Sequence, residues 1–185
     1  MMTIPNLITT LRIILVPIFV IYLINGRFMV ALTLFILAGL SDGADGLAAR
    51  LLDQKSRLGS YLDPLADKFL IIAAFVVLAF RDTVPPWLTV TVITRDILIL
   101  LGVLILFLTK QNIVIRPSVL SKLTTCFQLA TIFLVLAGND FQIFPHIIQA
   151  SYIAAGILTV ASGLHYMRCW FQMMGEGFPD HKGSK

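Results

Sequence analysis

The sequence predicts an all-α integral membrane protein in which six transmembrane helices form a bundle. Of its 185 residues, 58% are hydrophobic and 13% are charged, and the mean hydropathy is +0.91. A soluble domain with one apolar core contains fewer apolar residues, and these values are typical of a small polytopic membrane protein. The apolar residues also fall in long runs separated by short polar loops. We expect a single six-helix membrane domain over residues 1–175 and a polar tail over residues 176–185.

The first three apolar runs have recognisable ends. Residues 7–24 follow a proline and an asparagine, which favour a turn and a helix start. Residues 28–52 include the roughly 20 residues that a helix needs to cross hydrocarbon, and their second half carries acidic side chains. The polar linker at residues 53–59 is short, so the third helix, residues 60–80, should return antiparallel beside the second. The polar halves of these two helices then meet at one membrane face.

The last three runs follow equally clear breaks. Two prolines in the turn at residues 81–86 precede the fourth run, residues 87–108. A basic loop precedes the fifth run, residues 119–137, and a Gly-Asn-Asp turn precedes the sixth, residues 147–173. The pattern contains no internal repeat and no low-complexity segment.

The basic residues predict the orientation of the chain. If the amino end is cytoplasmic, eleven of the 14 Lys and Arg residues lie on the inner side, and Arg27 and Arg81 lie outside. This asymmetry follows the positive-inside rule and places both termini and the acidic helix ends at the cytoplasmic face, as expected for a bacterial inner membrane. The net charge of +4 is spread among short loops, so we expect contact with anionic lipids and none with nucleic acid.

Four carboxylates fall where a membrane segment should be apolar. Asp42 and Asp45 are three residues apart, and Asp63 and Asp67 are four apart, so each pair shares one face of a helix. Ionised carboxylates in apolar surroundings are costly unless a cation lies between them, and hard oxygen ligands suit Mg²⁺ or Mn²⁺. We expect a divalent metal site, with two ions. Helix capping and pairing with nearby basic side chains form the structural alternative, and an ion or proton pathway forms the functional one.

The spacing of these acids belongs to a longer pattern, which reads Asp42, two residues, Asp45-Gly46, two residues, Ala49-Arg50, eight residues, Gly59, three residues, Asp63, three residues, Asp67. The pattern resembles the signature of the CDP-alcohol phosphotransferases, integral membrane enzymes of phospholipid synthesis. Residues 4–19 also resemble the start of phosphatidylglycerophosphate synthases and of CMP-forming cardiolipin synthases. Weaker likeness reaches Arg95-Asp96 and residues 121–128.

The resemblance implies an activity and a set of site residues. The activity is transfer of a phosphatidyl group from CDP-diacylglycerol to a glycerol-type alcohol, with glycerol 3-phosphate as the acceptor that we expect and with release of CMP. The resemblance makes Asp42, Asp45, Asp63 and Asp67 the metal ligands, and Asp67 also the candidate base for the acceptor hydroxyl. Bound metal would neutralise the charge that grows on the leaving CMP. The resemblance also implies a homodimer.

Three further positions are expected to bind the CDP substrate. Gly46 lies one turn beyond Asp42, where the absence of a side chain lets a nucleotide approach, or lets another helix pack closely. Arg50 could reach a phosphate group, and extension to the membrane interface is its alternative. Gly59 borders the nucleotide by resemblance, and a simple loop glycine is its alternative.

The candidates for binding the acceptor are Arg95, Arg116 and Lys122. Arg95 lies inside the fourth apolar run, so it should face the bundle, paired with neighbouring acids or bound to phosphate. Arg116 and Lys122 flank the start of the fifth helix and could hold an anionic acceptor, or could serve only as positive-inside residues. Many phosphatidylglycerophosphate synthases carry a second lysine where this chain has Thr124. This difference weakens glycerol 3-phosphate as the acceptor and keeps phosphatidylglycerol, the cardiolipin synthase substrate, as the alternative.

Overall fold

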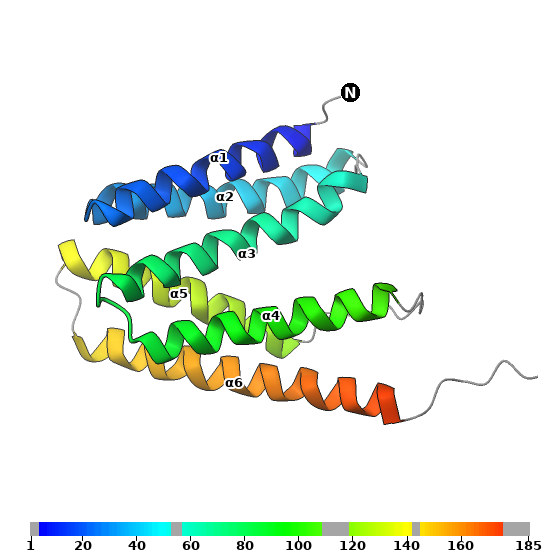
Figure 1. Cartoon of the computed structure of the whole chain (residues 1–185). Coiled ribbons are helices and arrows are strands. Elements are labelled where there is room, and N and C mark those ends of the chain that lie inside the picture. The colour runs from blue at the N-terminus through cyan, green and yellow to red at the C-terminus, as the bar shows by residue number, and fades with distance from the viewer. Residues whose placement is uncertain (1–3, 53–56, 109–118, 142–144, 176–185) are drawn as a thin grey trace, which may run out of the picture.

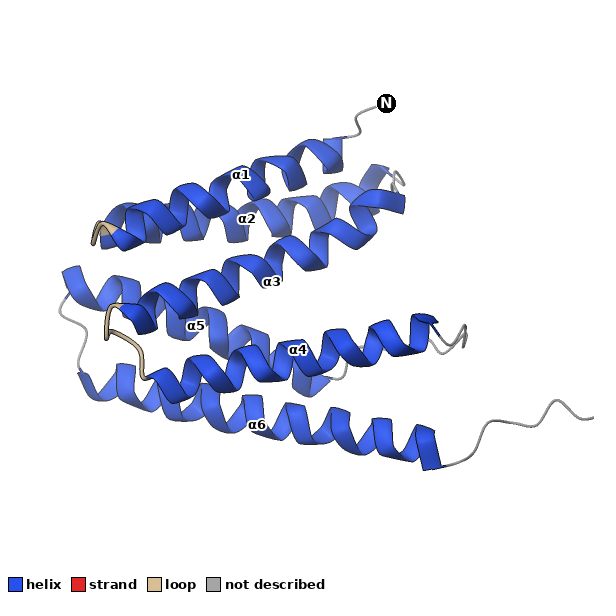
Figure 2. Ribbon diagram, viewed as in Figure 1, coloured by secondary structure: helices blue, strands red, loops and turns tan. Residues whose placement is uncertain are grey.

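The structure is a computed structural model, and the part of the chain that it describes folds into six α-helices with no strand (Figures 1 and 2). The structure describes the backbone of residues 4–52, 57–108, 119–141 and 145–175, and the side chains of residues 14–41, 68–102, 119–138, 145–168 and 170. The helices are α1 (Ile4–Ile24), α2 (Phe28–Leu52), α3 (Arg57–Phe80), α4 (Pro86–Leu108), α5 (Val119–Phe141) and α6 (Pro145–Gly175). The predicted order of six helices is confirmed, with bounds that agree to within about one helical turn.

The helices form two groups of three, which lie one above the other in Figure 1. In the first group α1 packs against both α2 and α3, and in the second α6 packs against both α4 and α5. The groups are joined because α3 contacts α4 and α5, while α2 contacts α5. As expected, α3 runs antiparallel to α2. The prediction that it packs directly beside α2 was wrong, because the helices that α3 packs against are α1, α4 and α5.

The turn between α1 and α2 is closed by a side chain from elsewhere in the chain. Gly26 has a φ of 71°, a left-handed conformation that favours glycine. The Arg81 Nη1 group donates a hydrogen bond of 2.5 Å to the carbonyl oxygen of Ile24, and the guanidinium lies 5.4 Å from the centre of the Phe28 ring. A Cβ at position 26 would come within 2.9 Å of Arg81 Nη2. Arg81 therefore satisfies a carbonyl that the end of α1 leaves without an intrahelical partner.

The turn between α3 and α4 stops one helix and starts the next. Thr83 Oγ1 donates to the carbonyl oxygen of Leu78 at 2.8 Å, which satisfies a group at the end of α3. Tyr152 on α6 donates its hydroxyl hydrogen to the carbonyl oxygen of Thr83 at 2.7 Å. Proline suits the first position of a helix because its missing N–H would be unpaired there, and both α4 and α6 begin with proline.

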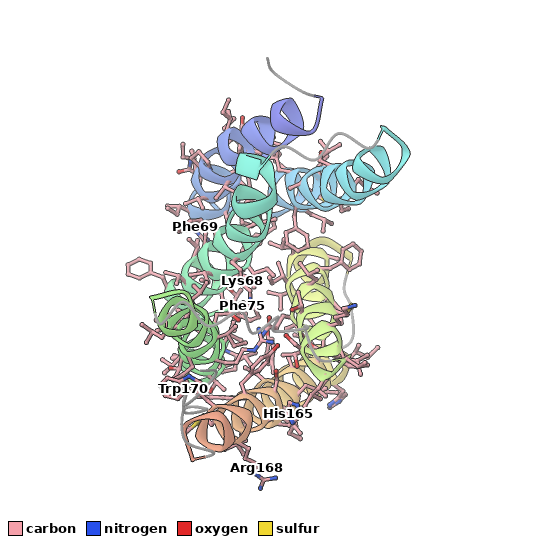
Figure 3. All side chains as sticks on the ribbon, turned by 90° about the vertical axis from the view of Figure 1, so that its right-hand side faces the viewer. Lys68, Phe69, Phe75, His165, Arg168 and Trp170 are labelled. Atoms are coloured by element: carbon pink, nitrogen blue, oxygen red, sulfur yellow. The ribbon has the colours of Figure 1, made fainter. Side chains whose placement is uncertain are left out.

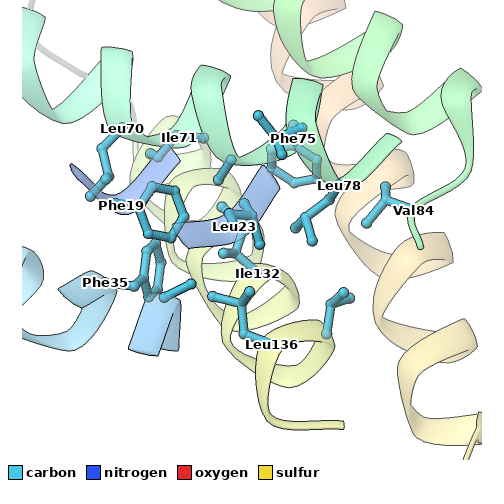
Figure 4. Packing of buried hydrophobic residues seen from close by; sticks show 14 of the residues in the cluster. Phe19, Leu23, Phe35, Leu70, Ile71, Phe75, Leu78, Val84, Ile132 and Leu136 are labelled. Atoms are coloured by element: carbon cyan, nitrogen blue, oxygen red, sulfur yellow. The ribbon is translucent and has the colours of Figure 1, made fainter. Parts of the chain in front are cut away.

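The apolar core lies between the first group of helices and α5, and it continues onto α4 through Leu88 and Val92 (Figure 4). Phe19 of α1 and Phe35 of α2 are both buried, with ring centroids 6.1 Å apart. Phe75 of α3 and Ile132 of α5 are fully buried and extend this core between the two groups. The core therefore holds α3, which carries half of the acidic signature, against the second group.

The outer surface is rich in exposed apolar side chains, including Phe80, Val90 and Ile157. Among the described side chains, two helical stretches are long and apolar enough to cross a membrane, Val119–Gly138 and Pro145–Arg168. Shorter apolar stretches occur in α1, α2 and α3. An apolar outer surface of this kind suits contact with lipid.

Candidate active site

The two helices that carry the acidic signature are joined at one end of the bundle. Asp42 and Asp45 lie in α2, and Asp63 and Asp67 lie in α3. The end of α2 and the start of α3 lie at the same end of the bundle, on the right-hand side of Figure 1, and Figure 3 shows that they are spread apart there. The side chains of these four residues are outside the described part of the chain. Their role as metal ligands, and that of Asp67 as a base, stay predictions.

The three positions expected to bind the CDP substrate lie on the same two helices. Gly46 and Arg50 follow the first acid pair along α2. Gly59 lies within the first turn of α3, because that helix begins at Arg57, slightly earlier than predicted. The side chains around these three positions are also outside the described part of the chain. For each position, substrate binding and the structural alternative given above therefore both stay open.

An ion cluster, buried at Arg95 and Asp96 and partly exposed at Lys68, begins immediately after Asp67. Lys68 Nζ on α3 donates a hydrogen bond to Oδ1 of Asp96 on α4 and forms an ion pair with it. Arg95 Nη1 donates to the same oxygen at 2.5 Å. Asp96 is completely buried, and Arg95 is 3% exposed. One carboxylate oxygen therefore holds two cationic groups and joins α3 to α4.

Arg95 also contacts the other two helices of its group. Its Nη2 atom donates to Ser121 Oγ on α5 at 2.5 Å and to Ser162 Oγ on α6 at 3.2 Å. Within the described part of the chain, Arg95 Nε and Asp96 Oδ2 are buried and have no hydrogen-bond partner. Pairing of Arg95 with a neighbouring acid, one of the two arrangements expected from the sequence, is present. A phosphate group would have to approach the Nε edge of the guanidinium or displace a serine.

The other acceptor candidates do not join this cluster in the described structure. Lys122 is exposed, and it follows Ser121, which contacts Arg95. Neighbouring residues of an α-helix point in different directions, so the structure does not bring Lys122 to the Arg95 guanidinium. Arg116 lies outside the described residues. Acceptor binding by Arg116 and Lys122 stays a prediction.

A row of buried polar side chains continues from Ser121 along the contact between α5 and α6. Gln128 Nε2 donates to Thr159 Oγ1 across this contact at 3.1 Å. The Thr124 and Thr131 hydroxyls each lie 2.8 Å from a carbonyl oxygen of their own helix and within reach of one on α6, that of Leu158 at 3.1 Å and that of Ser151 at 3.3 Å. Sequence reasoning missed Ser121 as a partner of Arg95. The signal was available, because Ser121, Thr124, Gln128 and Thr131 recur on one face of an apolar helix.

The Arg95–Asp96 pair shows that the bundle can hold charged groups away from water. The oxygen donors that suit a hard divalent cation are the four acids of the signature. Among the described side chains, no group of three or more His, Cys, Asp or Glu residues could hold a metal ion. The side chains of the four signature acids lie outside the described part of the chain, and these acids remain the candidate ligands. Four carboxylates on two joined helices match the oxygen ligands that Mg²⁺ and Mn²⁺ prefer.

Comparison with known proteins gives a family match over nearly the whole chain. The model of the CDP-alcohol phosphatidyltransferase family matches residues 2–173. A Bacillus subtilis protein named CDP-diacylglycerol--glycerol-3-phosphate 3-phosphatidyltransferase is 34% identical over 184 residues, which cover 90% of this chain and 94% of that protein. An Aquifex aeolicus protein of the same name is 30% identical over 96% of this chain and 97% of its own length.

Animal proteins named for a different product show similar identity to this chain. The CMP-forming cardiolipin synthase of Rattus norvegicus is 35% identical over 170 residues, which cover 91% of this chain and 55% of the rat protein. The chain therefore spans little more than half the length of that animal relative, and nearly all of the two bacterial ones. Similarity alone does not separate the two acceptors.

Proposed function

This chain belongs to the CDP-alcohol phosphatidyltransferase family, and we propose that it transfers a phosphatidyl group from CDP-diacylglycerol to glycerol 3-phosphate. The products are phosphatidylglycerophosphate and CMP. The observation that carries the proposal is the complete acidic signature, placed on two helices that are joined at one end of the bundle. Two relatives named for this reaction match nearly end to end, which supports the acceptor. Family membership also favours an enzyme over an ion or proton pathway.

The proposed reaction replaces the phosphoanhydride bond to CMP by a phosphate ester bond to the acceptor. The acceptor hydroxyl oxygen forms a bond to the phosphorus that carries diacylglycerol, the bond from that phosphorus to the CMP oxygen breaks, and the hydroxyl proton passes to Asp67. Asp42, Asp45, Asp63 and Asp67 would hold Mg²⁺ or Mn²⁺, which would neutralise negative charge on the diphosphate. Gly46, Gly59 and Arg50 would border the nucleotide and its phosphates. In this assignment, the residues that bind the donor substrate, CDP-diacylglycerol, all lie on α2 and α3.

The membrane arrangement follows from the same placement. We expect all six helices to cross the membrane, with the joined ends of α2 and α3 at the cytoplasmic face, because cytidine nucleotides and glycerol 3-phosphate are water-soluble and diacylglycerol is not. The site should then open to the cytoplasm and sideways to lipid. Exposed apolar side chains on α3, α4 and α6 support contact with lipid. A homodimer remains part of the proposal.

Phosphatidylglycerol is the second candidate acceptor, which would make the chain a cardiolipin synthase. Two observations favour it: the similarity to CMP-forming cardiolipin synthases, and Thr124 at the position of a second lysine. Thr124 is fully buried, and its hydroxyl lies within hydrogen-bond distance of the carbonyl oxygens of Leu120 and Leu158, so this position contributes no cation to an anionic acceptor.

A substrate panel tests the function and separates the two acceptors. Purified protein in detergent receives CDP-diacylglycerol with Mg²⁺ and, in separate reactions, glycerol 3-phosphate, phosphatidylglycerol, inositol phosphate or serine. Released CMP is measured and the lipid product is identified by mass, with the Asp67→Asn variant as the background control. We expect phosphatidylglycerophosphate. Cardiolipin as the main product would move the assignment to the second candidate, and no CMP with any acceptor would refute the proposed function.

A further inference from the structure

We propose that Asp96 is a positioning residue for phosphatidyl transfer. By holding Lys68 and Arg95 on one oxygen, Asp96 would fix the turn of α3 that follows Asp67 against the second group of helices. The inference rests on the function proposed above, and it concerns a residue that lies outside the acidic signature.

The first argument is the burial of the cluster. Asp96 is completely buried, and two cations share its Oδ1 atom. Removing charged groups from water is costly, so a buried ion cluster adds little net stability compared with well-packed apolar side chains. The best-supported use of such clusters is to select one arrangement of the packed elements over others. The Asp96 cluster is therefore better explained by placement than by stability.

The second argument is where the cluster lies. Lys68 follows Asp67 directly, and one residue advances an α-helix by only about 1.5 Å. Figure 3 shows Lys68 directed toward the middle of the bundle, whereas Arg168 projects away from it. From Asp96 the contacts continue through Arg95 to Ser121 on α5 and Ser162 on α6. One chain of polar contacts thus runs from the edge of the signature across four helices.

The third argument is the division of the proposed site between the two groups of helices. The acids for the donor substrate are on α2 and α3, whereas the acceptor candidates Arg95 and Lys122 are on α4 and α5. Transfer requires both substrates to be aligned, and a misplacement of about 1 Å can lower a rate by roughly 100-fold. A contact that sets α3 relative to α4 therefore controls the geometry of the reaction.

Asp96→Glu is the most informative substitution, because it keeps the charge and moves the carboxylate by one methylene group. We expect its kcat, with both substrates saturating, to fall roughly tenfold or more at temperatures where the variant is folded. The melting temperature shows which temperatures these are, because an added methylene group at a buried position also lowers stability. Asp96→Asn should lower kcat at least as far. If the cluster only balanced charge, Asp96→Glu would keep the wild-type kcat, and that result would overturn the proposal.

Thr89→Val is the matched control. Thr89 Oγ1 donates to the carbonyl oxygen of Phe75 at 3.2 Å, so it is another buried polar contact between α4 and α3. Its loss should lower stability and leave kcat nearly unchanged at temperatures where the protein is folded. A fall in kcat equal to that of Asp96→Glu would show that any weakened contact between these helices has the same effect, and would also overturn the proposal.

A distance measurement tests the positioning without relying on activity. Spin labels at positions 69 and 164, which are 58% and 52% exposed, would report the spacing of α3 and α6 in a chain whose cysteines have been replaced. Asp96→Asn should shift or broaden the distance distribution, and Thr89→Val should not. An unchanged distribution in Asp96→Asn would refute the positioning role. Failure of the wild type to release CMP would instead refute the proposed function, while the distances would still report what Asp96 holds in place.

Discussion

The indole ring of Trp87, at the start of α4, lies against Gly156 of α6, where a Cβ atom would come within 2.6 Å of the ring. The absence of a side chain at position 156 therefore lets the two helices pack closely. Small residues serve this purpose in membrane helix pairs, because the approach of the backbones increases van der Waals contact.

Gly156→Ala should therefore destabilise the protein, by about 1–3 kcal/mol, because the added methyl group overlaps a rigid ring. The measurement is the melting temperature or the denaturant midpoint in detergent. Gly102→Ala is the control, since the space at position 102 is open in the structure, and alanine there should be neutral or slightly stabilising. Equal melting temperatures for Gly156→Ala and the wild type would contradict the tight contact.

Asp67→Asn should abolish nearly all turnover while the protein remains folded. The amide keeps the shape of the side chain and loses its negative charge and its ability to accept a proton. CMP release at saturating substrates measures the effect, and the melting temperature checks the fold. A variant that kept about a tenth or more of the wild-type rate would rule out an essential base or ligand at this position.

Removal of divalent metal should stop the reaction. The reason is chemical, since four hard carboxylates are the candidate ligands and the leaving CMP gains negative charge. Exhaustive chelation should abolish CMP release, and adding Mg²⁺ or Mn²⁺ should restore it. Parallel samples that receive Ca²⁺ or a monovalent salt instead show whether the recovery is specific to these ions. Full activity after chelation would show that the acids act without metal.

Neutralising a residue that binds the acceptor phosphate should raise the acceptor KM. For Lys122→Gln or Arg116→Gln we expect an increase of about tenfold or more, because a charge-assisted hydrogen bond contributes roughly 1.5 to 3 kcal/mol. The KM for CDP-diacylglycerol should change little. Arg168→Gln is the control, since Arg168 is an exposed basic residue at the same expected membrane face. An unchanged acceptor KM would show that Lys122 and Arg116 do not bind the acceptor and serve only as positive-inside residues that orient the chain in the membrane.

The fold could be predicted from sequence because each helix has a local signal. Apolar runs set the helix lengths, and Pro86 and Pro145 mark two of the starts. The expectation that Arg95 faces the bundle also came from local chemistry, because an isolated guanidinium inside an apolar run needs a partner. The structure shows that partner to be Asp96, its own neighbour in the chain.

The contacts between side chains on different helices could not be predicted in the same way. Lys68 looked like one more basic residue at the inner face, and its pairing with Asp96 joins positions 28 residues apart. Ser162 carried no signal of its own, since a serine inside a membrane helix commonly bonds to its own helix. Tertiary packing brings these side chains together, and no sequence spacing encodes it.

The Arg81 contact with Ile24 affects the order in which parts of the fold are completed during synthesis. These residues are 57 positions apart, so synthesis passes through α2 and α3 before the side chain that closes the end of α1 exists. Until then the carbonyl oxygen of Ile24 lacks its side-chain partner, and the turn is held by Gly26 and by backbone hydrogen bonds such as that from Arg27 N–H to the carbonyl oxygen of Tyr22. The hairpin of α1 and α2 therefore reaches the form seen in the structure only when α3 has been made and its end at Phe80 has arrived beside that hairpin.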